Sequence, residues 1–421
     1  MRRLVLVGAG HAHAIVLHHW ARQALAGTDL LVVSPEPLAP YSGMVPGWLA
    51  GVYRFEEIVI DFPALCQAAG ARWVEAALYS VDPCKRQMVL EDGRRIDYDL
   101  LSLNLGSTLR PPPTRHAAML PLRPLALLRR RYEPFIERWS LVGADGVPGG
   151  QVAGMTDCQY TTTLQAARHR PLSVCAVGSG PAGFEALLAV LRRLRSLRPD
   201  RPVLGHMISQ STAVLTGLAP TAQAAALRAL ARADVQVQLG QEWSASLDGA
   251  CDLVLWATGA QAQDWQRDPR RRGSLAVDDG GFVRIDPHLR SISHPSVFAV
   301  GDCAHWSAQP LPKAGVIAVR MGPVLARNLR AALATGDPGD ASEATPGLAS
   351  YQPQSRVLSL LATGDGSAIA ARGAFAAEGA WAWRWKNSID RRFLRRFRLP
   401  TSAPYANRHA TQDRAGAHEG R

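Results

Sequence analysis

The first residues of this chain restrict its fold more than any other stretch. An apolar run from Leu4 to Val7 ends in Gly8-Ala9-Gly10, and an apolar-periodic segment follows at once. This order predicts a strand, a tight glycine turn and a helix, the opening unit of a dinucleotide-binding fold. Gly8 permits the turn, and Gly10 lets the backbone approach a pyrophosphate at the helix N-terminus. His13 stands where such motifs usually carry a third glycine.

A complete version of the same motif lies in the middle of the chain. An apolar run over 172–177 leads into Gly178-Ser179-Gly180-Pro181-Ala182-Gly183, and an amphipathic helical pattern follows. Two such units predict two dinucleotide sites. The second strand of this unit is expected near 203–209, and no acidic residue closes it, so the choice between NADH and NADPH stays open. A closing strand ends in Ala257-Thr258-Gly259.

Two segments that follow the first motif are placed to contact a bound dinucleotide. The strand expected at 30–34 ends in Ser34, where an acidic residue usually holds a ribose, and Glu36 follows two positions later. A serine can still donate a hydrogen bond to a ribose, but a weaker one. The loop 40–47 is rich in proline and glycine. It is either a surface turn or the lining of a cofactor's ring system.

Two buried strands are expected to end beside the same ligand. One, over 97–107, ends in Gly106-Ser107, where backbone can pass close to a ligand. The other, over 296–300, runs into Gly301-Asp302. The carboxylate of Asp302 can accept a hydrogen bond from a ribityl or ribose hydroxyl.

Length and cysteine usage narrow the class of protein. A chain of 421 residues allows about three domains of ordinary size. No apolar run is long enough to span a membrane, and no signal peptide opens the chain. We therefore expect a cytoplasmic protein, which can also lie at the inner face of the membrane. The six cysteines are widely scattered without a CxxC pair, which argues against a metal site, a disulfide framework and a redox-active dithiol.

The formal charge of +12 comes mainly from arginine clusters. It is explained either by solvated arginine-rich faces or by attraction to anionic lipid or anionic cofactors, and nucleic acid is the weakest of the candidate partners. Near the C-terminus, an aromatic stripe with arginines beside it predicts an amphipathic helix. That helix can lie in a membrane interface or can cover the core. The stripe consists of Trp381, Trp385, Ile389, Phe393 and Phe397.

These motifs, taken in order, resemble the two-dinucleotide-domain flavoproteins of the pyridine nucleotide–disulfide oxidoreductase superfamily. Four further stretches are similar to a narrower group within it, the type II NADH dehydrogenase-like flavoproteins, some of which occur fused to selenide, water dikinase. The stretches are Gly10-His11-Ala12-His13, Pro40-Tyr41-Ser42-Gly43-Met44, Pro312-Lys313-Ala314-Gly315-Val316 and Leu358 to Gly366.

The resemblance implies an α/β fold with two Rossmann-like dinucleotide-binding domains, the second inserted in the first, and a small C-terminal α+β region. We expect a split FAD-binding domain over 1–145 and 275–335, and an NAD(P)-binding domain over 150–272. The C-terminal region with the amphipathic helix would cover 340–400, and 401–421 would form a disordered tail.

The resemblance, together with the strand ends and the charge of reduced flavin, predicts a set of cofactor-binding residues and two catalytic residues. Glu185 matches the family's acidic residue near the nicotinamide, unless it is a solvated helix carboxylate. Lys313 would stabilise reduced flavin, unless it is an exposed lysine at a helix start. No metal site is expected. The expected cofactor-binding residues are Gly8, Gly10, His11, Ser34, Tyr41, Ser42, Gly43, Met44, Gly106, Gly178, Gly180, Gly183, Gly259, Gly301 and Asp302.

The function implied is transfer of hydride from NAD(P)H to FAD and of electrons onward to a quinone or similar small acceptor. One alternative is a flavoprotein of selenium or sulfur metabolism with an inorganic donor. Another is a flavin-bound docking protein with negligible turnover. No cysteine stands where disulfide reductases or sulfide:quinone reductases carry theirs, which argues against sulfur chemistry on the protein. Peripheral contact with an anionic membrane is a further expectation, and the oligomeric state stays open.

Overall fold

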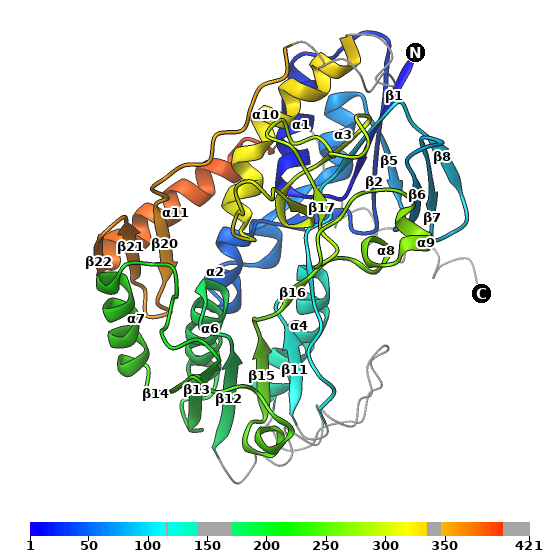
Figure 1. Cartoon of the computed structure of the whole chain (residues 1–421). Coiled ribbons are helices and arrows are strands. Elements are labelled where there is room, and N and C mark those ends of the chain that lie inside the picture. Colours follow the sequence, from blue (N-terminus) through cyan, green and yellow to red (C-terminus); the bar gives the residue numbers. More distant parts are fainter. Residues whose placement is uncertain (115–116, 142–170, 335–346, 399–421) are drawn as a thin grey trace, which may run out of the picture.

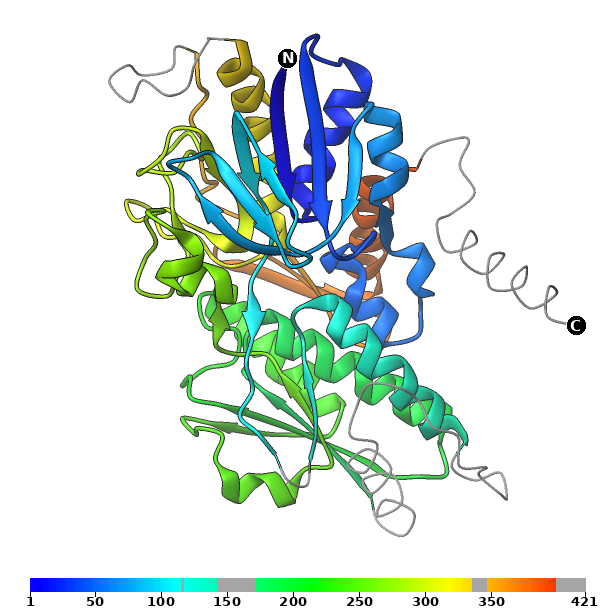
Figure 2. The same ribbon diagram turned by 90° about the vertical axis from the view of Figure 1, so that its right-hand side faces the viewer.

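Two parallel sheets, one in each half of the molecule, form its framework (Figures 1 and 2). The structure is a computed structural model, and it describes residues 1–114, 117–141, 171–334 and 347–398. In both sheets the strands are largely buried, because helices or loops cover them on each side. The mixed α/β fold with two Rossmann-like halves, predicted from the sequence, is confirmed.

The first sheet has the order β18-β9-β1-β2-β5. Helices α1 (His11–Arg22), α3 (Phe62–Ala69) and α10 (Gly315–Ala334) belong to this half. Helices α1 and α10 pack closely, since a Cβ added at Gly322 would come within 2.7 Å of Ile15. The strands are β1 (Arg2–Val7), β2 (Thr28–Ser34), β5 (Arg72–Glu75), β9 (Leu100–Leu103) and β18 (Val297–Ala299).

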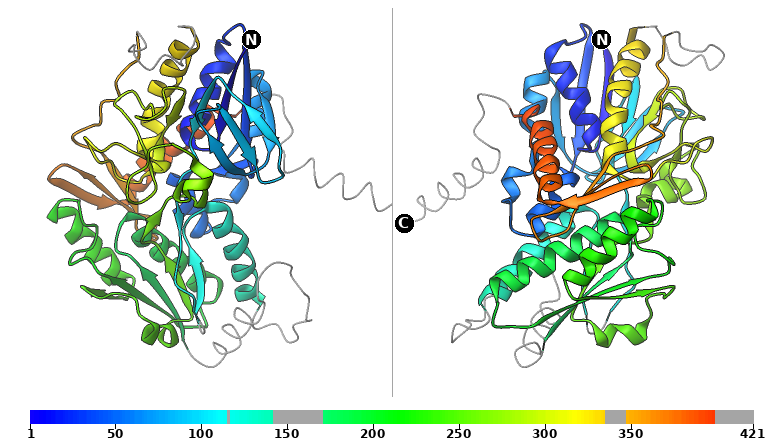
Figure 3. Two further views of the ribbon diagram at one scale, coloured as in Figure 1. Left: turned by 45° about the vertical axis from the view of Figure 1, so that its right-hand side comes forward. Right: turned by 90° about the vertical axis from the view of Figure 1, so that its left-hand side faces the viewer.

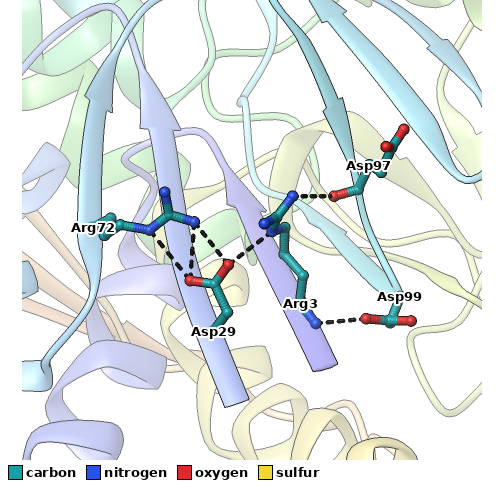
Figure 4. Close-up of polar contacts among 5 residues, drawn as sticks. All are labelled: Arg3, Asp29, Arg72, Asp97 and Asp99. Atoms are coloured by element: carbon teal, nitrogen blue, oxygen red, sulfur yellow. Dashed lines mark hydrogen bonds and ion pairs between the residues drawn. The ribbon is translucent and has the colours of Figure 1, made fainter. Parts of the chain in front are cut away.

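An ion network connects the starts of neighbouring strands of this sheet (Figure 4). It lies at the end of β1 opposite to the glycine turn, which follows Val7. Asp29 accepts hydrogen bonds from Arg3 Nε at 2.8 Å and from Arg72 Nη2 at 2.7 Å. Burial raises the pKa of Asp29, but the two arginines outweigh it and hold that pKa below its usual range. The backbone N–H of Arg3 donates to Asp99 Oδ2 at 2.6 Å. These charges stabilise the sheet and take no part in the site described below.

The second sheet has the order β11-β15-β12-β13-β14. Helices α4 (Leu125–Leu141), α6 (Pro181–Leu197) and α7 (Pro220–Arg232) accompany it. Its strands are β11 (Ala118–Pro121), β12 (Leu172–Val177), β13 (Val203–Ser209), β14 (Val235–Leu239) and β15 (Leu253–Trp256).

The predicted boundary between the two dinucleotide domains, at 145–150, is too late in the chain. Strand β11 pairs in parallel with β15, and Trp139 of α4 donates a hydrogen bond to Leu194 O of α6 at 3.1 Å. Residues from about 118 onward therefore belong to the second half. The chain crosses between the halves where β10 (Thr108–Leu109) pairs with β16 (Ala260–Gln261). Both crossings thus lie side by side.

The C-terminal segment joins the two halves. Strands β20 (Ser359–Ala362), β21 (Ala368–Arg372) and β22 (Phe375–Gly379) form an antiparallel sheet on α6 and α7 of the second half. Helix α11 (Ala380–Arg395) lies beside the first half (Figure 3, right). The predicted tail 401–421 lies outside the described residues.

Shorter elements complete the two halves. No helix in the described ranges combines the length and apolarity that a membrane span requires. The shorter elements are β3 (Leu38–Pro40), η1 (Ser42–Met44), α2 (Val45–Leu49), η2 (Phe55–Glu57), β4 (Val59–Asp61), β6 (Leu78–Asp82), β7 (Gln87–Leu90), β8 (Arg95–Asp97), η3 (Ala245–Ala250), α8 (Asp264–Arg267), α9 (Pro269–Arg272), β17 (Val283–Arg284), η4 (Gly301–Cys303) and β19 (Ala304–His305).

Candidate functional site

The first glycine turn joins β1 to α1, as predicted. Gly8 adopts a φ of 99°, which favours glycine, and an added Cβ would lie 2.5 Å from Asn104 O. Gly10 has an ordinary extended backbone, with φ −85°. A Cβ there would nevertheless lie 2.0 Å from Asn104 Oδ1. Both glycines are therefore required by the protein's own packing.

His13, which replaces the third glycine of the motif, is fully buried behind this turn. Burial lowers the pKa of His13 to about 4, so the imidazole is neutral at physiological pH. Its Nδ1 lies 2.7 Å from Gly8 O, which can only accept, so Nδ1 carries the proton. Nε2 then accepts from Ser102 Oγ at 2.9 Å. The side chain thus binds the glycine turn to β9 rather than disrupting it.

The second glycine turn joins β12 to α6. Gly178 has a φ of 109°, and a Cβ added at Gly183 would lie 2.1 Å from Gly178 O, so helix and turn pack closely. At Gly180 an added Cβ would meet no atom of the described residues within 4 Å. No described side chain therefore fills the space beside Gly180. Gly259, after β15, is similarly open and has a φ of 74°.

The segment from Tyr41 to Met44 lies at the N-terminal ends of α1 and α10. The backbone N–H of Ser42 donates to His11 Nε2 at 3.4 Å, and a Cβ added at Gly315 would lie 2.2 Å from Ser42 Oγ. Burial lowers the pKa of His11 to about 4. The structure therefore brings the expected isoalloxazine-lining residues next to the first glycine turn.

Asp302 is bound by an arginine that sequence reasoning missed. Arg123 Nη1 donates to Asp302 Oδ2 at 2.5 Å and to Ser107 Oγ at 2.8 Å, and Arg123 Nη2 donates to Lys313 O at 2.9 Å. Arg123 follows β11, the strand that was assigned to the wrong half, so its position could not be inferred. Gly106 lies one residue before Ser107, and a Cβ added there would meet no described atom within 4 Å.

Lys313 is turned toward the protein. Its Nζ donates to Ala304 O at 2.6 Å and lies 3.7 Å from the centre of the Phe282 ring. Burial lowers the pKa of Lys313. The guanidinium of Arg123 is the cation that contacts the turn at Asp302. The flavin-stabilising role of Lys313 remains a prediction.

Glu185 lies near the start of α6, at the junction of the two halves and the C-terminal segment. Its Oε1 accepts from the backbone N–H of Ala362 at 2.7 Å. Burial raises the pKa of Glu185 to about 7, against the opposing effect of Lys386. A carboxyl group with this pKa exchanges protons near neutral pH, which a solvated helix carboxylate does not do.

Two buried charges on α11 lie close to Glu185. Lys386 and Asp390 are each only 6% exposed, and Lys386 Nζ donates to Asp390 Oδ2 at 2.8 Å and to Gly43 O. Burial and the hydrogen-bonded Asp390 carboxylate raise the pKa of Tyr41. Sequence reasoning missed both charges, although a Lys–Asp pair four residues apart on the apolar side of a helix was a usable signal.

The two ribose positions carry serines. Ser34 is buried at the end of β2, and Glu36 accepts a hydrogen bond from Arg130 at 2.5 Å. Ser209 ends β13 and accepts a hydrogen bond from Ser179 Oγ at 2.9 Å.

The His, Cys, Asp and Glu side chains of the described ranges do not gather into a metal site. No group of three or more His, Cys, Asp or Glu side chains there could hold a metal ion. Cys175 and Cys251 are thiols, not a disulfide, and their side chains interact inside the second half, a proximity that their spacing did not reveal. Their contact with each other and burial raise the pKa of Cys175, so the pair is unreactive in the thiolate sense.

A chain with a glycine turn in each of two parallel sheets, and a Gly-Asp turn beside the first, has the architecture of a two-dinucleotide-domain oxidoreductase. A family model described as pyridine nucleotide-disulphide oxidoreductase matches residues 2–322, so the chain belongs to this family. The superfamily inferred from the motifs is thus confirmed. FAD and NAD(P)H, predicted as cofactor and co-substrate, are those of the family.

Individual relatives agree with this assignment. The type II NADH:quinone oxidoreductase NdhA of Mycobacterium tuberculosis is 28% identical over 179 residues, which is 36% of this chain and 37% of that protein. The chain therefore spans little more than a third of that relative's length. The sulfide:quinone oxidoreductase of Aquifex aeolicus has the same fold at 15% identity, with a TM-score of 0.70 over 98% of this chain and 95% of that one. NDH2 of Plasmodium falciparum in complex with NADH matches at 11% identity and a TM-score of 0.67, over 92% of this chain and 97% of that one.

Proposed function

We propose that the protein oxidises NAD(P)H through FAD and passes the electrons to a quinone or a similar small acceptor. The observation that carries the proposal is the position of Glu185. Its carboxyl group, with a pKa of about 7, lies at the start of the helix that follows the second glycine turn. Lys386 connects this region to Gly43, beside the first turn. The quinone named for the Mycobacterium relative supports the choice of acceptor.

The residues of the first half fit FAD. The first turn, at the N-terminus of α1, would hold the pyrophosphate, and Asp302 after β18 would hold the ribityl chain. The space beside Gly106 is free of side chains among the described residues. When bound, FAD supplies the two-electron chemistry between the nicotinamide and the acceptor. The second turn, open at Gly180, would hold the pyrophosphate of NAD(P)H.

Glu185 would deliver a proton to the acceptor side of the reaction. Reduction of a quinone consumes two protons with two electrons, and NAD(P)H brings the equivalent of only one proton with its electrons. The second proton must come from water through the protein. Because the pKa of Glu185 is about 7, the carboxyl group can bind and release that proton at neutral pH. Lys386 and Asp390 hold the Tyr41–Met44 segment beside it.

The exposed face of α11 is proposed as the contact with an anionic membrane surface. Trp381, Trp385 and Ile389 are 46%, 43% and 41% exposed, and the two indole rings stack at 6.2 Å. Phe393 and Phe397, at the end of the predicted stripe, are buried against the first half. The stripe therefore divides into an exposed part and a core part. Exposed arginines flank it, an arrangement suited to lipid headgroups.

Steady-state assays with matched donors and acceptors test the proposal. We expect oxidation of NADH or NADPH to depend on a water-soluble quinone and to require bound FAD. Reduction of the flavin by sulfide or selenide, but by neither nicotinamide, would replace the proposal with the inorganic-donor alternative. A flavin-loaded protein that turns over with none of these donors would support the docking protein instead.

A further inference from the structure

We propose that Asn104 is a positioning residue that fixes the first glycine turn in the conformation that holds a resident FAD. Its counterpart, Ala257, makes no such contact, so the second turn stays open for a dinucleotide that exchanges. The inference rests on the proposed function for the assignment of FAD to the first turn and NAD(P)H to the second. It concerns why one chain would hold one dinucleotide permanently and the other transiently.

The Asn104 side chain connects three separate segments of the first half. It is 4% exposed. Its Oδ1 accepts from the backbone N–H of Ala12 at 3.1 Å and of His13 at 3.4 Å. These are two of the donors that the first turn of a helix leaves without an intrahelical partner. Its Nδ2 donates to Val300 O at 3.0 Å. One side-chain amide thus connects the start of α1, the end of β9 and the turn after β18.

The glycines of the expected FAD site pack directly on this amide. A Cβ added at Gly10 would lie 2.0 Å from Asn104 Oδ1, and one added at Gly301 would lie 2.8 Å from Asn104 Nδ2. Both distances are too short for any side chain without a shift of the neighbouring atoms. The two glycines are therefore fitted to Asn104, and the three residues form a single packed unit.

Ala257 occupies the matching position in the second half. Asn104 directly follows β9, and Ala257 directly follows β15. A Cβ added at Gly8 would contact the Asn104 backbone, just as one added at Gly178 would lie 3.2 Å from the Ala257 backbone. Ala257 carries only a methyl group, and Gly180, the N-cap residue of α6, has no side chain to cap that helix. Among the described residues, Ser179 of the second turn is held from β13 through Ser209 Oγ at 2.9 Å, but no side chain is seen to cap the start of α6 as Asn104 caps the start of α1.

The difference has an energetic consequence. Asn104 fixes the first turn before a cofactor arrives, so binding need not order that backbone, and a preorganised site binds more tightly. The amide is neutral, and it adds no charge that would repel a pyrophosphate. The second turn keeps its helix donors for water or for the ligand, so release of NAD(P)H leaves them solvated rather than buried and unsatisfied.

The rate of FAD release from Asn104→Ala tests the inference. Loss of a buried amide that makes three hydrogen bonds should accelerate FAD dissociation, followed by the fluorescence of released flavin, by about 10- to 100-fold. With saturating FAD, the KM for NAD(P)H should be unchanged. A purely global destabilisation would not produce this split between the two dinucleotides.

Two further variants complete the test. Asn104→Asp keeps the shape and the acceptor oxygen but loses the donor to Val300 O and adds a negative charge near the expected pyrophosphate, so for both reasons FAD release should again be faster than in the wild type. Ala257→Asn should cap the start of α6 as Asn104 caps that of α1, so it should lower the KM for NAD(P)H and slow NAD(P)H release, with FAD release unchanged. This pair also keeps the test valid if Asn104→Ala does not fold.

An FAD release rate equal to that of the wild type in both Asn104 variants would overturn the inference. Tighter FAD binding in Asn104→Ala would overturn it as well, and would show that the amide competes with the cofactor for the helix donors. Such a result would leave the proposed function intact. A wild-type protein that binds no FAD would overturn both.

Discussion

The two dinucleotide-binding halves use the same local backbone in different surroundings. Gly10 and Gly180 have closely similar conformations, with φ and ψ of −85° and 162° at the first and −72° and 177° at the second. An added Cβ would collide with Asn104 at the first and would meet no described atom within 4 Å at the second. The first glycine is thus required by the protein's interior, whereas the second keeps a space free. The first half is closed and the second is open.

The third glycine position of the two motifs also differs between the halves. Gly183 allows α6 to approach the Gly178 turn, since any Cβ there would lie 2.1 Å from Gly178 O. At the equivalent position His13 forms hydrogen bonds with Gly8 O and Ser102 Oγ. A motif with two glycines and a histidine therefore builds the same turn, but a more rigidly connected one.

The largest effect is expected when the second glycine of each motif is replaced by alanine. Gly10→Ala should abolish FAD binding and all activity, because its Cβ would lie 2.0 Å from Asn104 Oδ1. Gly180→Ala should keep the protein folded and yellow but raise the KM for NAD(P)H, since the Cβ would occupy the open approach. Flavin content after purification and NAD(P)H titration separate the two outcomes. Equal FAD loss in both variants would break the distinction between a closed and an open turn.

Replacement of Glu185 by glutamine probes the junction between the halves. The raised pKa of about 7 means that the carboxyl group is protonated below that pH and ionised above it. A step that takes its proton should therefore slow as pH rises through about 7 in the wild type. Glu185→Gln should lower the rate of quinone reduction on the order of 10²-fold and remove this pH dependence. Flavin reduction by NAD(P)H serves as the control and should be little changed. A wild-type pH profile retained in the variant would exclude Glu185 as the donor.

The sequence predicted the glycine turns because strand, turn and helix are local and are written in consecutive residues. The end of β13 at Ser209 and the turn at Gly301-Asp302 were predicted for the same reason. Arg123 and Lys386 were missed because their roles arise only when distant segments meet. The domain boundary was wrong because glycine and proline content marks loops, whereas the pairing of β11 with β15 decides which sheet a strand joins.

Helix α11 has a buried side and an exposed side, and removal of its arginine charges tests whether the exposed side binds a membrane. Changing Arg391, Arg392, Arg395 and Arg396 to glutamine should weaken cosedimentation with anionic vesicles several-fold or more, since each basic residue near such a surface contributes about 1 kcal/mol. The binding should also fall as salt rises. The matched control changes the same number of exposed arginines outside α11: Arg94, Arg95, Arg270 and Arg284. No binding of the wild type at low salt would assign α11 to core packing alone.

The smallest effect is expected from the thiols of the second half. Cys175 and Cys251 touch each other within an apolar cluster of the second half. Replacement of all six cysteines, by alanine where they are buried, should leave the rate of flavin reduction within about 3-fold, because the hydride step belongs to the cofactor. A correctly folded single variant that loses several orders of magnitude would instead indicate thiol chemistry.

The central claim is that one chain holds two unlike dinucleotide sites. The most direct test is to mix the purified, flavin-loaded protein anaerobically with NADH and with NADPH. The flavin absorbance and the amount of FAD that stays bound are followed together. The account predicts that at least one nicotinamide bleaches the flavin rapidly and saturably, while FAD remains on the protein through repeated cycles of reduction and reoxidation. A flavin that neither nicotinamide reduces, or an FAD that exchanges as readily as the nicotinamide, would contradict it.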